Sequence, residues 1–138
     1  MVCISMVANY WLISSSCLFL IPSFYAYHRQ FYNVSGIGVA TVLVSINYWR
    51  NPIPSMRKTM DITVANCCFV FVTYNGICYV PLFPSIMIGN PLLFITVWFF
   101  YLSNYYYGIG NPNWVLFHML FHYCIAVGFG MMITYITE

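Results

Sequence analysis

Long runs of apolar residues, separated by short polar breaks, make up almost the whole chain. Five runs are long enough to cross a bilayer as helices, and they cover about residues 3–27, 33–49, 62–80, 86–107 and 114–136. Each crossing needs about 20 mostly apolar residues. Segments such as Cys67–Val72 lack the alternation of apolar and polar positions that marks a transmembrane β-strand. The pattern therefore predicts an all-α integral membrane bundle of about five transmembrane helices, forming a single domain.

The polar breaks predict short connections between these helices. The break at Arg50–Met60 holds two prolines and three cations, so we expect an aqueous loop there. The N-terminal run lacks the positive start of a secretory signal, because no Lys or Arg precedes its apolar residues. We therefore expect residues 3–27 to be a retained first helix, bent near Pro22.

Composition agrees with a lipid environment. Only 4% of the residues are charged and 62% are hydrophobic, whereas a soluble domain has roughly a quarter of its residues charged. The lipid bilayer is thus the first predicted partner. Four cations in the whole chain exclude nucleic-acid binding on electrostatic grounds. Most of the six cysteines fall inside predicted membrane helices, where we expect free thiols that behave as small apolar side chains.

The cations predict an orientation, because Lys and Arg concentrate in cytoplasmic connections. Arg50, Arg57 and Lys58 are three of the four cations, so this connection is placed inside and is the predicted docking surface for a soluble partner. Five crossings then place the N-terminus inside and Glu138 outside. Tyr and Trp cluster near the predicted helix ends, where aromatic rings anchor in the headgroup zone; examples are Tyr48-Trp49, Tyr105–Tyr107 and Trp114.

Three ionisable residues are candidates for function, because such groups are costly inside a bilayer. They are Asp61, His118 and His122. The two histidines lie four positions apart, on one helix face, and such a pair can chelate a transition metal. The predicted topology places them at the same depth as Asp61 and Ser45. One interpretation is a zinc site in which Asp61 is the third ligand.

The alternative interpretation is a polar cluster that ties three helices together. In that arrangement Asp61 caps its helix and pairs with Arg57. The histidines bond to Asn66, Ser45 or backbone carbonyls, and no cofactor is bound. Interhelical hydrogen bonds of this kind contribute roughly 0.6–2 kcal/mol each in membranes.

The order Ser45-x-x-x-Trp49, Asp61, His118-x-x-x-His122 resembles the membrane hydrolase superfamily of alkaline ceramidases and progestin/adiponectin-type receptors. The resemblance implies a seven-helix bundle in which three histidines bind zinc. It also implies that the Asp and the Ser hold a metal-bound water that cleaves an amide. This chain departs from the pattern in two ways. Trp49 stands where the family has its first zinc histidine, and there is room for only five helices.

A structural role is the first functional prediction. The residues Tyr48-Trp49-Arg50-Asn51-Pro52, Arg57 and Asp61 are similar to those of small multi-spanning membrane proteins of large DNA viruses. That resemblance implies a virion subunit in the internal membrane and capsid layer, a minor capsid protein among other protein subunits. An accessory subunit of an organellar membrane complex and a degenerate zinc-dependent amidase are the alternatives. A channel would need a polar seam through the bundle, whereas the polar residues gather mainly at one end.

Overall fold

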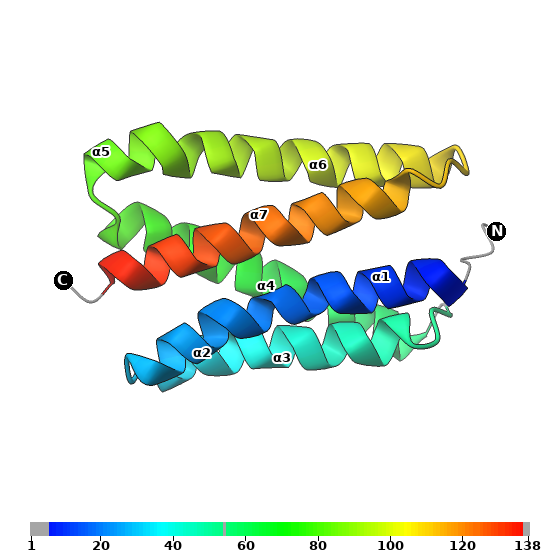
Figure 1. Ribbon diagram of the computed structural model, residues 1–138, viewed down its shortest axis with the longest axis horizontal. Coiled ribbons are helices and arrows are strands. Elements are labelled where there is room, and N and C mark those ends of the chain that lie inside the picture. The colour runs from blue at the N-terminus through cyan, green and yellow to red at the C-terminus, as the bar shows by residue number, and fades with distance from the viewer. Residues whose placement is uncertain (1–5, 54, 137–138) are drawn as a thin grey trace.

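The computed structural model describes residues 6–53 and 55–136, and all regular structure in them is helical. This confirms the all-α prediction. The elements are α1 (Met6–Ser16), the 3₁₀ turn η1 (Cys17–Phe19), α2 (Leu20–His28), α3 (Tyr32–Trp49), α4 (Met56–Tyr79), α5 (Leu82–Pro84), the π-helical turn η2 (Ser85–Gly89), α6 (Asn90–Gly108) and α7 (Trp114–Tyr135). All of them run roughly along one axis of an elongated bundle (Figure 1).

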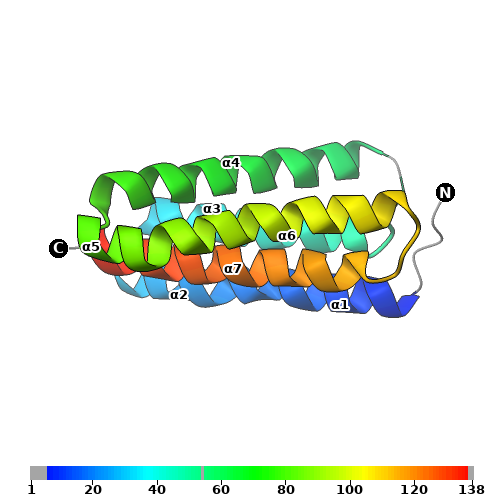
Figure 2. The same ribbon diagram turned by 90° about the horizontal axis from the view of Figure 1, so that it is seen from above.

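The chain passes back and forth along this axis. The α1–η1–α2 segment runs one way, α3 returns, and α4, α6 and α7 continue the alternation (Figures 1 and 2). The connections after Trp49 and after Gly108 therefore lie at the same end of the bundle. We call this the Arg50 end, because it holds Arg50, Arg57 and Lys58.

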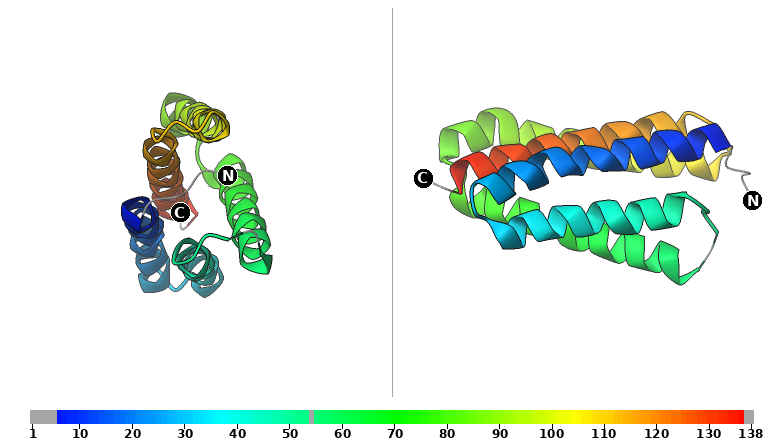
Figure 3. Two further views of the ribbon diagram at one scale, coloured as in Figure 1. Left: turned by 90° about the vertical axis from the view of Figure 1, so that its right-hand side faces the viewer. Right: turned by 60° about the horizontal axis from the view of Figure 1, so that its bottom comes forward.

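Helix α7 is the central packing element. It contacts α6, α1, α2 and α4, and it contributes Phe129, Met132 and Ile133 to the fully buried core. Close approach of α3 to this core depends on Gly38, which faces Ser23 and Phe129. Helices α4 and α6 both lie beside α7 but do not pack closely against one another, as the end-on view in Figure 3 shows.

Prolines explain the two places where helix type changes. Pro22 has no N–H to bond to the carbonyl of Leu18, and the chain forms the 3₁₀ turn η1, which contains Leu18 and ends three residues before the proline. The predicted irregularity near Pro22 is therefore a change of helix type at Cys17–Phe19. Pro84 directly precedes the π-helical turn η2, and Pro91, two residues beyond it, has no N–H to bond to the carbonyl of Met87.

Within residues 6–53 and 55–136, three helical segments are long and apolar enough to cross a membrane: Met56–Tyr79, Leu82–Gly108 and Trp114–Tyr135. Their length and apolar composition support the coarser prediction of membrane association. The other two predicted crossings correspond to Met6–His28, which the 3₁₀ turn divides, and to α3, which has 18 residues.

The predicted loop at residues 50–60 is wrong in its second half. Helix α4 begins at Met56, so Arg57 and Lys58 lie in its first turn rather than in a connection. Ser55 precedes the helix with extended backbone angles (φ −161°, ψ 175°). Asp61 is consequently inside the helix and does not cap it. The error arose because hydropathy locates only the start of the apolar run. Met, Arg and Lys are good helix formers, so the helix begins several residues before that run.

Candidate functional site

A cavity of about 360 Å³ lies near the Arg50 end, between α3, α4, α6 and α7. Ser45, Asp61, His118 and His122 all line it. The structure thus brings the four candidate residues to one cavity, as the predicted topology required. Of the three docking cations, Lys58 lines the cavity as well, whereas Arg50 and Arg57 are not among its lining residues.

Ser45 and Asp61 form the tightest polar contact of the cavity. The Ser45 hydroxyl donates to Oδ1 of Asp61 at 2.5 Å, and both residues are buried. The bond links α3 to α4. In the parts of the chain that the structure describes, no cation forms an ion pair with Asp61, so the predicted partner Arg57 is replaced by Ser45.

His122 is bonded to Ser15 of α1 through its Nδ1 atom, at 3.0 Å from the hydroxyl oxygen. The Ser15 hydroxyl also donates to the carbonyl of Leu12, at 3.0 Å. Because a hydroxyl has one proton, the shared geometry makes Nδ1–H of His122 the donor to Ser15. The unprotonated nitrogen of His122 is then Nε2.

His118 follows the same pattern with a different helix. Its Nδ1 atom lies 3.4 Å from the hydroxyl oxygen of Ser103, which itself donates to the carbonyl of Trp114 at 3.3 Å. The same proton count makes Nδ1–H of His118 the donor and leaves the lone pair on its Nε2 atom. In metal-ligating histidines the second ring nitrogen usually donates to a carboxylate, a backbone carbonyl or water. Here a serine hydroxyl takes that place at both histidines.

The histidine partners differ from those that the sequence predicted. Asn66 and Ser45 do not bond to the imidazoles, and Ser15 and Ser103 do so instead. Spacing along a single helix carries no signal for these partners, since they lie on α1 and α6. Ser15 reaches His122 because α1 packs against α7.

Aromatic rings enclose the histidine pair. The two imidazole centroids are 4.6 Å apart, and Trp49 meets the His118 ring edge-on at 5.5 Å. Trp114 lies 6.2 Å from the same ring. Trp49, Trp114 and Tyr48 are buried, so the prediction that they anchor in the headgroup zone is wrong. Their π faces and edges pack on one another and on His118 instead.

The predicted zinc set is not assembled in this arrangement. Among the described residues, no group of three or more His, Cys, Asp or Glu side chains is close enough to hold a metal ion. Asp61 accepts a hydrogen bond from Ser45, and Trp49 beside His118 offers no ligand atom of the required kind. The histidine pair is therefore at least one protein ligand short of a catalytic zinc site, which has three.

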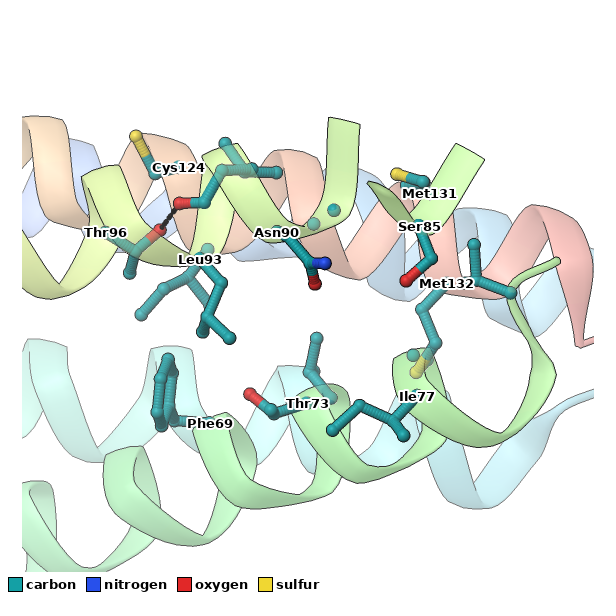
Figure 4. A pocket seen from close by; sticks show the side chains of 17 residues that line it. Phe69, Thr73, Ile77, Ser85, Asn90, Leu93, Thr96, Cys124, Met131 and Met132 are labelled. Atoms are coloured by element: carbon teal, nitrogen blue, oxygen red, sulfur yellow. Dashed lines mark hydrogen bonds between the residues drawn. The ribbon is translucent and has the colours of Figure 1, made fainter. Parts of the chain in front are cut away.

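A second, smaller cavity of about 100 Å³ continues along the bundle away from the Arg50 end. Figure 4 shows Phe69, Thr73 and Ile77 of α4 opposite Leu93 and Thr96 of α6 across this space. Phe69, Thr96 and Ile125 line both cavities. We call the combined space the α4–α6 crevice.

Fold and site together define a helical protein with membrane-competent helices and a polar cluster at one end of an apolar crevice. Comparisons with protein-family models, with curated proteins and with solved structures find no match. The resemblance to the membrane hydrolase superfamily and the resemblance to membrane proteins of large DNA viruses therefore stay predictions.

Proposed function

We propose that the protein is a multi-pass membrane protein with five crossings that serves as a structural subunit of a larger membrane assembly. The observation that carries this proposal is the outward apolar surface. Only 6% of the apolar window in Leu82–Gly108 is buried. Large side chains such as Phe94 and Tyr101 are more than half exposed along α6. Lipid and neighbouring subunits are the two kinds of partner able to cover such a surface.

The docking surface of this subunit is the Arg50 end. Arg50, Arg57 and Lys58 are three of the four cations in the chain, and they lie together in sequence around the α3–α4 connection. A soluble or capsid-layer protein with an acidic face is the complementary partner. The internal membrane of a large DNA virus is the favoured setting, and an organellar membrane complex is the second.

Topology mapping tests the first part of the proposal. Glycosylation acceptor sites inserted at residues 28–31, 50–53 and 109–113 report which side each connection faces. We expect the first site to lie on the side opposite to the other two, in a protein that resists alkaline extraction from membranes. Extraction by alkali, or modification of all three sites from one side, would contradict five crossings.

Co-purification tests the second part. Replacing Arg50, Arg57 and Lys58 by Gln should release the partner subunits while membrane insertion persists. Arg29→Gln, at the other end of the bundle, is the matched control and should keep them. Loss of the partners from both variants, or from neither, would argue against docking at the Arg50 end.

A zinc-dependent amidase is the second candidate, and a specific observation favours it. Both histidines keep Nδ1 bonded to a serine, and their side chains line the same cavity as the Ser45–Asp61 pair. A zinc ion bound there would supply a Lewis acid and an activated water. The described residues supply no third protein ligand for such an ion.

Metal analysis tests this candidate. Purified protein is expected to hold less than one equivalent of zinc, whereas Trp49→His, which adds an imidazole beside His118, should raise the zinc content. Trp98→His on the exposed face of α6 is the control. Stoichiometric zinc in the unmodified protein that disappears in His118→Ala and His122→Ala would favour the amidase over the structural role.

A further inference from the structure

The α4–α6 crevice is open toward the side of the bundle. Helices α4 and α6 do not pack closely on one another. The rims between them carry half-exposed apolar side chains, together with the exposed amides of Asn66 on α4 and Asn104 on α6. Ile62 is 48% exposed on one rim, and Val97 and Phe100 are 53% and 49% exposed on the other. In a membrane, such an opening faces the acyl chains of the bilayer.

The floor of the crevice is suited to a hydrocarbon chain. Phe121 and Ile125 of α7 line it between the rims, and Phe69 marks the point where the two cavities meet. Lys58 and Phe69 are separated by 11 positions of α4. At 1.5 Å per residue this is about 16 Å, or roughly half of the 30 Å hydrocarbon core. The larger cavity therefore matches the depth of a single leaflet.

The mouth of the crevice is cationic. Lys58 lines it and is exposed, and Arg50 and Arg57 belong to the same end of the bundle. The carboxylate of Asp61 is nearby but is buried and accepts its hydrogen bond from Ser45. An anionic headgroup is therefore favoured over a zwitterionic one at this mouth.

From these observations we infer that the crevice binds one anionic phospholipid, with its phosphate against Lys58 and one acyl chain lying between α4 and α6 as far as Phe69. This inference rests on the proposed membrane-spanning role. It adds a lipid class and a binding site that the structural role does not require.

Lipid-dependent stability is the direct test. Full-length protein in a neutral detergent is heated with dioleoyl phosphatidylglycerol, dioleoyl phosphatidylcholine or dihexanoyl phosphatidylglycerol. We expect the first to raise the unfolding temperature most, because it alone combines the charge and the long chain. Equal effects of the two dioleoyl lipids, or of the two phosphatidylglycerols, would overturn the inference.

Two variants distinguish the contribution of the lipid headgroup to binding from that of the acyl chain. Lys58→Gln should weaken phosphatidylglycerol binding about five-fold and leave phosphatidylcholine binding unchanged. Ala65→Leu fills the larger cavity and should reduce binding of both long-chain lipids, while Ala40→Leu on the exposed face of α3 is the matched control. Unchanged lipid binding in both test variants would refute the site.

A fluorescence measurement avoids any change to the cavity wall. The chain has four tryptophans, of which Trp49 and Trp114 line the crevice. In a Trp11→Phe, Trp98→Phe variant, phosphatidylglycerol with brominated acyl chains should quench the remaining emission at a lower mole fraction than the brominated phosphatidylcholine does. Equal quenching by both lipids would exclude a selective site. Alkaline extraction in parallel distinguishes this failure from failure of membrane insertion itself.

Discussion

The hydroxyl of Ser45 donates a 2.5 Å hydrogen bond to Oδ1 of Asp61, and this bond joins α3 to α4 beside the larger cavity. Ser45 is 4% exposed and Asp61 is 8% exposed. No ion pair to Asp61 is found within residues 6–53 and 55–136. The Ser45 hydroxyl therefore supplies the hydrogen bond that satisfies the buried carboxylate of Asp61.

Ser45→Ala should destabilise the protein by about 1–3 kcal/mol, because it leaves a buried acceptor unsatisfied. Asp61→Asn keeps an acceptor for Ser45 and should cost less. Ser14→Ala, on the exposed face of α1, is the control. Equilibrium unfolding in mixed micelles measures these free energies. If Ser45→Ala changes stability no more than Ser14→Ala does, the bond has no structural role.

Gly38 is the position at which α3 tolerates no side chain. A Cβ atom there would collide with Oγ of Ser23 and lie 2.9 Å from Cε1 of Phe129. Gly38→Ala should therefore destabilise the protein by about 1–3 kcal/mol, as overpacking does in a close-packed core. Unfolding of the purified variant in micelles measures the change.

Gly36 provides the matched control for this substitution. It lies in the same helix, two positions away, and a Cβ atom there meets nothing within 4 Å. Gly36→Ala should be neutral or stabilise α3 by up to about 1 kcal/mol through helix propensity. If both variants lost similar amounts of unfolding free energy, the cause would be the alanine in α3 itself. It would not be the close contact of Gly38 with α2 and α7.

Helix positions could be predicted from hydropathy, whereas the surroundings of the polar groups could not. Each predicted apolar run corresponds to a helical segment. A run of about 20 apolar residues is the length that a membrane-spanning helix needs, so hydropathy alone locates it. The start of α4 was missed because Arg57 and Lys58 are polar yet helical. Ser15 and Ser103 were missed because only the tertiary packing of α1 and α6 on α7 brings them to the histidines. Trp49 shows the same limit: its type suggested an interface anchor, and its packing on His118 buries it.

Two helix ends share one hydrogen-bond pattern but use different residues for it. After α2, Phe31 N–H bonds to the Ala26 carbonyl and Gln30 has a positive φ of 64°. After α6, Asn111 N–H bonds to the Tyr106 carbonyl and Gly110 has a φ of 71°. Both ends form the Schellman arrangement, in which glycine is the preferred residue at the left-handed position.

Gln30→Gly should therefore stabilise the protein by about 1 kcal/mol, since it relieves the left-handed conformation of a residue with a Cβ atom. Gly110→Ala is the reciprocal change and should destabilise by about the same amount. No atom lies within 4 Å of a Cβ built at Gly110, so this variant isolates the backbone effect. Thermal unfolding of both variants measures the shifts, and shifts of the same sign would contradict the assignment.

Thiol labelling tests whether α4 lies in hydrocarbon. Cys67 and Cys78 are both exposed on α4, but Cys67 lies midway along the helix and Cys78 next to its end. In open membrane fragments, a charged maleimide should modify Cys78 roughly ten-fold faster or more than Cys67, because charged groups do not enter the bilayer core at low cost. Single-cysteine versions measured by mass spectrometry give the two rates, and SDS-unfolded protein, in which both thiols must react, is the control. Equal rates in membranes would place Cys67 in water and remove α4 from the bilayer.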